Sequence, residues 1–273
     1  MQQYLGIDFS GGAKPWKMKC RNPTVWIATV CDDAGYVLTD LRPVQDLDGV
    51  GEPFERLVAF LKLGNFAAAA IDAPFALPSE HMPRGSYSQF LDQIRSLPNG
   101  TDRPFPLGAA ILALGETVAS KASKKPYRKT ERHWANLGVN TRSTMWNGIR
   151  PGSPFAAACL SLVSRVNRPV WPWHPVSGGM LVEAFPAAQL RYWGLPHQNY
   201  SGSEGRVNRE KIIETISTFV SMDFKTRKLT MDSSDALDAV VSCFAAIAVN
   251  TNRFEPADHS VDDGMIAVLR KPE

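Results

Sequence analysis

The chain has 273 residues, of which 44% are hydrophobic and 21% charged, and its net charge is +3. This composition is typical of a globular protein and excludes intrinsic disorder and collagen-like structure, while 20 glycines and 20 prolines exclude a long coiled coil. The net charge is too small to indicate nucleic-acid binding by itself, so any basic surface must be local.

The first 44 residues predict three strands. Residues 2–9, 24–31 and 36–44 are rich in β-branched and aromatic residues. The segment Asp32-Asp33-Ala34-Gly35 between the last two has the residues of a tight turn. Strands joined by so short a turn are antiparallel, so we expect an antiparallel meander.

The middle of the chain predicts helices around one short strand. Residues Pro53–Leu63 have helical spacing of apolar side chains, and residues 67–72 are apolar up to the final Asp, as in a buried parallel strand. Residues 78–104 are rich in Pro, Gly and Ser, which indicates an excursion or active-site lid. Residues 105–123 and 154–167 are expected to be helical, with a basic loop between them.

The last third predicts a strand at 180–185, a helix at 206–220, a helix from Asp235 to about Val249 capped by Ser233 or Ser234, and a strand at 265–269. The order of elements is that of the ribonuclease-H-like α/β fold. We therefore expect a mixed five-stranded sheet, with three antiparallel strands and then parallel strands, flanked by helices. One domain over 1–273, with an insertion at about 78–170, is the simplest organisation.

Acidic residues stand where these strands end. Asp8 closes the first strand, Asp72 closes the fourth, Glu183 lies in the fifth, and Asp235 and Asp238 share one face at the start of the last long helix. Converging carboxylates repel one another, and Mg²⁺ or Mn²⁺ relieves this repulsion because both favour oxygen ligands. The pattern predicts catalytic roles for all five acids and metal binding by the four aspartates. Two cations about 4 Å apart activate water in phosphodiester hydrolysis.

Each acid also has a simpler interpretation. A lone Asp at a strand end is usually a turn or cap residue. Asp235 is placed where a helix dipole stabilises negative charge, and Glu183 has Arg191 or a nearby Lys as an alternative partner. The joint pattern on two strands and one helix is what favours a site.

Basic residues gather in three places, each of which is a candidate for binding substrate. The first is the loop after the first strand, where Ser10, Lys14 and Lys17 would stand beside Asp8. The second is Arg142. The third is the stretch 121–133, in which Tyr127 and Trp134 interleave with Lys121, Lys124, Lys125, Arg128, Lys129 and Arg132. Basic residues with aromatic neighbours suit a nucleic-acid backbone, and a solvated helix end is the alternative.

The cysteines indicate a cytoplasmic protein. Cys20, Cys31, Cys159 and Cys243 form no CxxC motif, and no secretory signal opens the chain. The longest apolar run, Phe244–Val249, is too short to span a membrane. We expect reduced thiols and no membrane contact.

Short motifs spread over nearly the whole chain resemble the family catalogued as domain of unknown function 429, which is predicted to contain ribonuclease-H-like nucleases of the RuvC-like superfamily. The matching pieces are Gly6-Ile7-Asp8, Ala70-Ile71-Asp72-Ala73-Pro74, Tyr127–Arg132, Glu183-Ala184-Phe185-Pro186, Asp235-Ala236-Leu237-Asp238-Ala239 and Asp263-Gly264-Met265-Ile266. The resemblance implies metal ligands at Asp8, Asp72 and either Asp235 or Asp238.

The sequence therefore favours a divalent-metal-dependent nuclease that acts on nucleic acid or a nucleotide. Two alternatives stay open. One is an actin-like or sugar-kinase-like ATP-binding protein, which also opens with Gly-Ile-Asp and a small polar loop. The other is a non-catalytic nucleic-acid-binding protein with the same fold.

Overall fold

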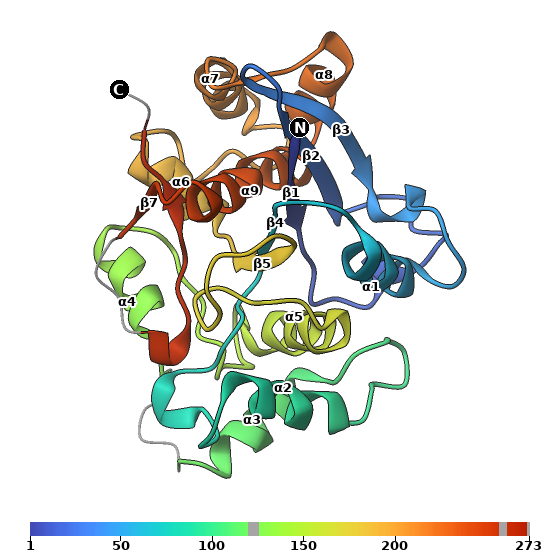
Figure 1. The fold of residues 1–273 in the computed structure, drawn as a ribbon, viewed down its shortest axis with the longest axis vertical. Coiled ribbons are helices and arrows are strands. Elements are labelled where there is room, and N and C mark those ends of the chain that lie inside the picture. The colour runs from blue at the N-terminus through green and yellow to red at the C-terminus, as the bar shows by residue number, and fades with distance from the viewer. Residues whose placement is uncertain (120–125, 257–260, 272–273) are drawn as a thin grey trace.

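The computed structural model describes residues 1–119, 126–256 and 261–271. Within these residues, six strands form one mixed sheet in the order β5-β4-β1-β2-β3-β6, and a two-stranded ladder pairs β7 with β8 (Figure 1). The strands are β1 (Gln2–Asp8), β2 (Trp26–Asp32), β3 (Tyr36–Pro43), β4 (Ala68–Asp72), β5 (Met180–Glu183), β6 (Val220–Ser221), β7 (Phe254–Glu255) and β8 (Val268–Leu269).

The pairing of the strands agrees with the expected α/β architecture. β1, β2 and β3 form an antiparallel meander, and β4 and then β5 add to β1 in parallel. The sequence did not predict β6, which pairs in parallel with the far side of β3. A strand of only two residues carries too little periodicity to be recognised.

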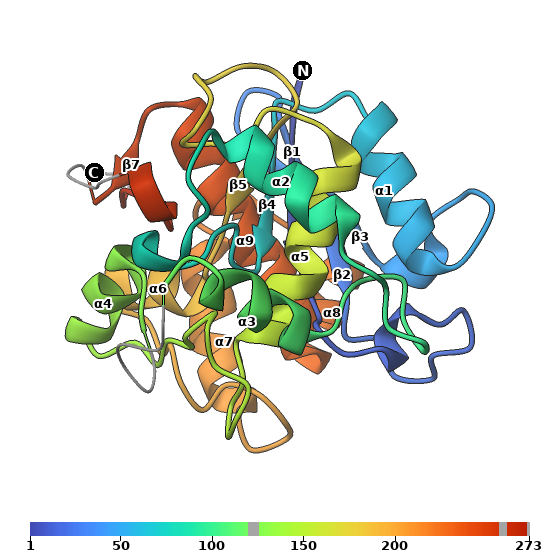
Figure 2. The ribbon, with the colours of Figure 1, turned by 90° about the horizontal axis from the view of Figure 1, so that it is seen from below.

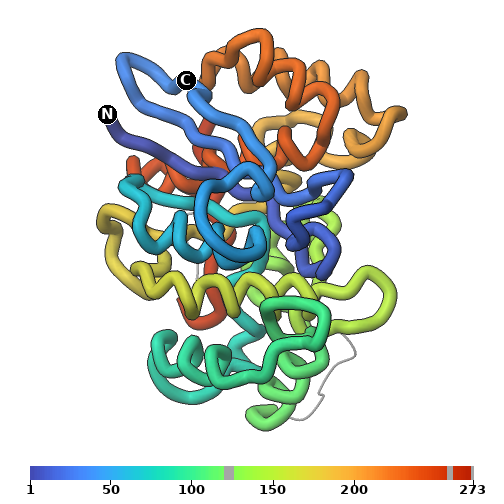
Figure 3. Tube along the Cα trace, turned by 90° about the vertical axis from the view of Figure 1, so that its right-hand side faces the viewer, coloured from blue at the N-terminus to red at the C-terminus, as the bar shows by residue number. Residues whose placement is uncertain are grey.

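Helices cover both faces of the sheet. The helices are α1 (Pro53–Leu63), α2 (Tyr87–Ser96), α3 (Gly108–Glu116), α4 (Lys129–Asn136), α5 (Ser153–Val166), α6 (Pro186–Tyr192), α7 (Arg206–Ile216), α8 (Phe224–Asp232) and α9 (Ser234–Asn250). On one face, α1 and α5 share a core with Leu5 and Ile7 of β1. Seen from below, α2 and α3 lie in front of α5 (Figure 2), and Figure 3 shows this layer at the end of the molecule opposite the β2–β3 hairpin.

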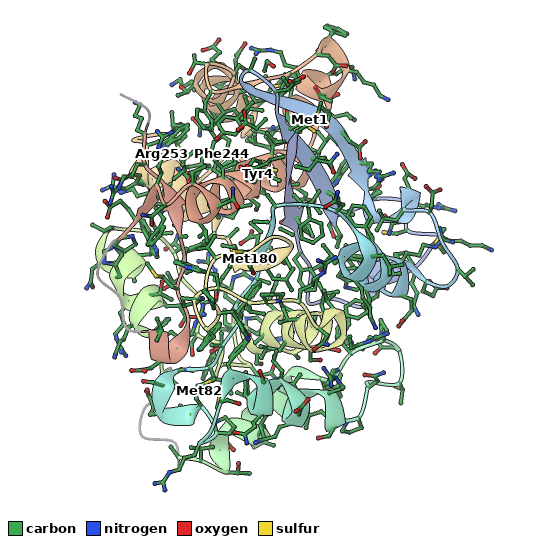
Figure 4. All side chains as sticks on the ribbon, viewed as in Figure 1. Met1, Tyr4, Met82, Met180, Phe244 and Arg253 are labelled. Carbon is green, nitrogen blue, oxygen red and sulfur yellow. The ribbon has the colours of Figure 1, made fainter. Side chains whose placement is uncertain are left out.

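The other face is covered by α9, whose apolar residues pack on alternate residues of the central strands. Tyr4 of β1 and Phe244 of α9 belong to this core (Figure 4). The helix begins at a cap that the sequence predicted, because the Ser233 hydroxyl accepts a hydrogen bond from the Ala236 amide at 3.2 Å.

A glycine sets the distance between α9 and β1. A Cβ on Gly6 would lie 2.1 Å from the carbonyl oxygen of Ala239 and 2.5 Å from the amide nitrogen of Cys243. Only a residue without a side chain lets the helix approach this closely. The N-terminal turns of α9 are thereby held over the end of β1 where Asp8 lies.

Three sequence predictions differ from the structure. The stretch expected as a basic loop becomes α4 from Lys129 onward, and the excursion 78–104 contains α2. The helix expected at 206–220 ends at Ile216, and Val220 belongs to β6 instead. In the described residues no helix is long and apolar enough to cross a membrane.

Candidate functional site

Asp8 and Asp72 are brought together by strand register. They are direct partners on the parallel strands β1 and β4, and both project toward the face that α9 covers, since Tyr4, Ala68 and Ala70 in the same alternation belong to that core. Parallel strands end at one edge of a sheet, so two acids that close such strands meet there. Asp235 and Asp238 reach the same place from the first turns of α9.

The electrostatics of these acids show that they share one environment. Burial first, and then the charges of Asp238, Asp72 and Asp235, raise the pKa of Asp8 well above its usual range. The pKa of Asp238 is also raised, by burial and by the charge of Asp72. Burial raises the pKa of Asp72 to about 7, although Arg142 acts in the opposite direction. Asp235 is less buried, and its pKa is raised mainly by burial.

A tyrosine that the sequence analysis missed completes this cluster. The Tyr200 hydroxyl donates a hydrogen bond of 2.8 Å to Oδ1 of Asp238. Burial, and next the charge of Asp238, raise the pKa of Tyr200 well above its usual range, so the hydroxyl stays a donor. It fixes one oxygen of Asp238. Tyr200 lies in an irregular loop 38 residues before its partner, so nothing in the sequence pattern indicated the contact.

A cavity of about 410 Å³ opens over the acids, and we call it the central cavity. Its carboxylates come from Asp8, Asp72, Glu131, Glu183 and Asp235. The rest of the lining is mixed, and it includes Phe9, Phe155, Phe185, Ser10, Thr24, Asn140 and Arg142. The guanidinium of Arg142 lies 5.1 Å from the ring centroid of Phe155, which holds a cation at the cavity beside Asp72.

Glu183 lies on a different face from the aspartates. Its register partner is Ile71, one residue before Asp72, so it points to the α5 side of the sheet. There it accepts two hydrogen bonds from the guanidinium of Arg128, at 2.7 Å and 2.5 Å, and one from the Phe75 amide at 2.9 Å. Neither Arg191 nor a lysine is its partner in this network.

Arg128 is buried by the same network. Its Nε also donates to Glu131 at 3.0 Å, and the carboxylates of Glu183 and Glu131 raise its pKa against the opposing effect of burial. Burial raises the pKa of Glu131 to about 7, although Arg128 opposes the shift. With 1% of its surface exposed, Arg128 forms the floor of the central cavity and ties α4 to β5. Breaking a buried pair of this kind typically costs 3–5 kcal/mol.

The other basic candidates divide into two groups. Lys14 and Lys17 line a second cavity of about 840 Å³, the basic cleft, which also includes Lys19 and Arg21 and meets the central cavity at Ser10 and Thr24.

The remaining candidates from the stretch 121–133 lie elsewhere. Lys129 pairs with Asp262 at 3.7 Å and Arg132 donates to the Tyr127 carbonyl at 2.7 Å. Neither side chain lines the central cavity or the basic cleft. Lys121, Lys124 and Lys125 lie outside the described residues.

A third cavity of about 390 Å³, the polar cavity, adjoins the central cavity. It shares Asn140, Thr141, Arg142 and Asp235 with the central cavity. Asp238 and Tyr200 line it, together with Arg150 and His197. Among the described basic residues that the sequence predicted to bind substrate, Arg142 is thus the one that lines both the central cavity and the polar cavity.

The suitability of the site for a metal ion rests on its donor chemistry. In the part of the chain that the structure describes, no group of three or more His, Cys, Asp or Glu side chains forms a ready-made metal site. Mg²⁺ is usually held by one or two carboxylates, with water and substrate phosphate as the other ligands. Asp8 and Asp72 could supply those carboxylates, and a cation there would relieve their mutual repulsion.

The turn after β1 packs closely against the start of α5. A Cβ on Gly11 would lie 2.6 Å from the Phe155 amide nitrogen, and the Gly12 amide is bonded to the Ser10 hydroxyl at 3.2 Å. Gly11 therefore packs against the start of α5, which leaves little of the turn to surround a phosphate as an ATP loop does.

The family model described as "Protein of unknown function (DUF429)" matches residues 6–260. No curated protein and no solved structure matches the chain significantly.

Proposed function

Because the chain belongs to the DUF429 family, whose description names no activity, we propose its function from its own site: it is a divalent-metal-dependent phosphodiesterase that cleaves nucleic acid. The observation that carries this proposal is the register pairing of Asp8 with Asp72 beneath Asp235 and Asp238 of α9, at the base of a cavity that also holds Arg142.

Burying these carboxylates together in ionised form costs free energy unless a cation offsets their negative charge. Burial and mutual repulsion raise the pKa values of Asp8, Asp72 and Asp238, so the folded chain binds protons there more tightly than the unfolded chain does. A bound cation replaces those protons and lets the carboxylates ionise. Asp8 and Asp72 would hold Mg²⁺ or Mn²⁺, with Asp235 or Asp238 completing the set. Such an ion supplies Lewis-acid activation of water and of the phosphate.

The remaining residues support the reaction through position and charge. Arg142 places a cation beside Asp72, where it attracts the phosphate and offsets its negative charge. Tyr200 fixes one oxygen of Asp238 and leaves the other oxygen for a ligand. The buried Arg128–Glu183 pair holds the cavity floor, so Glu183 assists by positioning. The free cysteines, three of them buried, agree with a reducing compartment, and we place the protein in the cytoplasm.

The test is a cleavage assay in Mg²⁺ or Mn²⁺ on single-stranded, duplex, hybrid and branched oligonucleotides. We expect Asp72→Asn to lower cleavage at least about a hundredfold, since a catalytic metal contributes several kcal/mol. Asp33→Asn, in the exposed β2–β3 turn, is the matched control and should keep wild-type activity.

Two outcomes contradict the proposal. Equal cleavage by wild type and Asp72→Asn would mean that the activity comes from elsewhere. Binding of oligonucleotide with no cleavage in any divalent ion would assign the fold to a non-catalytic binding protein.

A further inference from the structure

We propose that the substrate is a single-stranded polynucleotide, with one base held in the central cavity and the backbone running along the basic cleft on one side and the polar cavity on the other. This inference rests on the proposed function, because it takes the aspartates as the point of cleavage. It adds the class of strand and its path.

The central cavity adjoins both of the other cavities. Ser10 and Thr24 line both the basic cleft and the central cavity, while Asn140, Thr141 and Arg142 line both the central and the polar cavity. In Figure 2 the segment after β1 lies at the lower right, and the loops that precede α5 and α7 extend along the bottom of the view. The proposed strand follows these adjoining cavities, from the basic cleft over the aspartates to the polar cavity.

The charge along this path suits a polyanion. Lys14, Lys17, Lys19 and Arg21 are exposed or partly exposed around the basic cleft. The acid that lines the cleft, Asp102, is already paired with Arg103 at 2.7 Å. Cations beside an acidic centre fit a substrate whose flanking phosphates bind directly and whose central phosphate is bound through a metal ion.

The central cavity favours an unpaired base. Asp8 is 9% exposed, so a phosphate must enter the cavity to reach it. Phe155 and Phe185 line the wall, and Arg142 lies over Phe155. Aromatic rings and guanidinium planes are the surfaces on which single-stranded bases stack. A duplex is stiff and keeps its bases stacked inside, so it must unpair before a base enters such a recess.

The test is direct binding of a fluorescent 20-nucleotide single strand, and of the same sequence as a duplex, to the full chain in EDTA at several salt concentrations. We expect the single strand to bind at least about tenfold tighter than the duplex. Lys17→Ala/Lys19→Ala should lower the slope of log affinity against log salt by up to about 1.4, at roughly 0.7 per lost phosphate contact. Lys211→Ala/Lys225→Ala, on α7 and α8 away from the three cavities, is the charge-matched control.

Phe155→Leu tests the base-binding wall. It should weaken single-strand binding roughly fivefold or more without changing the salt slope, because stacking on an aromatic ring is lost while charge is unchanged. Phe224→Leu is the matched control, since Phe224 is 84% exposed on α8. Thermal melting of each variant checks that it is folded, and the exposed lysines provide a test that does not depend on Phe155.

Duplex binding as tight as single-strand binding, or lysine and Phe155 variants that behave as their controls do, would overturn the inference. Its failure is distinguishable from failure of the proposed function. Equal cleavage of single strand and duplex would refute the strand path and leave the phosphodiesterase intact. The predicted binding without cleavage in any metal would support the path and refute the phosphodiesterase.

Discussion

The pKa values of the clustered aspartates are set by burial and by the charges around them. Asp8, Asp238 and Glu183 face Asp72 with like charge, and Arg142 is the opposing cation. Burial and this surplus of negative charge keep the Asp72 proton bound up to a pH of about 7. Below about pH 7 a cation that binds at Asp72, as proposed above, must therefore displace a proton.

This gives a prediction for the pH dependence of stability. The pKa of Asp72 is raised from 3.8 to about 7 on folding, so its contribution to stability is full below about pH 3.8 and is lost as the pH rises to about 7. Asp72→Asn removes that loss. In EDTA, we expect the melting temperature of the variant minus that of the wild type to increase between pH 4 and pH 7 and then level off. A difference that stays constant over this range would contradict the raised pKa.

The residues of the site were predictable from the sequence to unequal degrees. Asp8 and Asp72 could be placed because parallel register fixes where strand-closing residues lie. The role of Arg128 depends on contact with Glu183, 55 residues away, and local composition showed only its charge. No sequence pattern marks Tyr200 as a site residue, because its role depends on a hydrogen bond to Asp238 that exists only in the folded chain.

At the scale of elements, the position of α9 decides whether the site exists. Its first turns carry Asp235 and Asp238, and its distance from β1 is set by Gly6. The sequence predicted α9 because a serine that can cap the helix precedes a long and regular run of apolar residues. It missed α2, although Ser86 and Gln89 form a capping box there, because the surrounding prolines and glycines outweighed that short signal. It also missed α6 and α8, which span 7 and 9 residues.

The contact at Gly6 gives a prediction about packing. Gly6→Ala places a Cβ against backbone atoms of α9 that cannot rotate away, so we expect a loss of about 3 kcal/mol or more in the free energy of unfolding. Urea denaturation measures this loss. Gly178→Ala is the control, because a Cβ there meets nothing within 4 Å. Equal stability of the two variants would show that α9 can move away from β1 at little cost.

At the scale of the whole molecule, the fold places the aspartates and the basic residues of the proposed substrate path at one edge of the sheet. The five-strand core followed from the order of elements, because a tight turn enforces antiparallel pairing and a helical crossover permits parallel pairing. The three adjoining cavities could not be predicted, since residues from the loop after β1, the loop before α5 and the loop before α7 build them together. Only the folded chain shows that the predicted Lys14 and Arg142 line adjoining cavities.

The most direct test of the central claim is a titration with Mn²⁺ at pH 8, followed by electron paramagnetic resonance, which counts free and bound ion. The wild type and Asp33→Asn are expected to bind Mn²⁺. Asp8→Asn/Asp72→Asn is expected to lose that binding, because the proposal makes these two carboxylates the ligands of the ion. A wild type that binds no Mn²⁺, or a double variant that binds it as the wild type does, would contradict the claim.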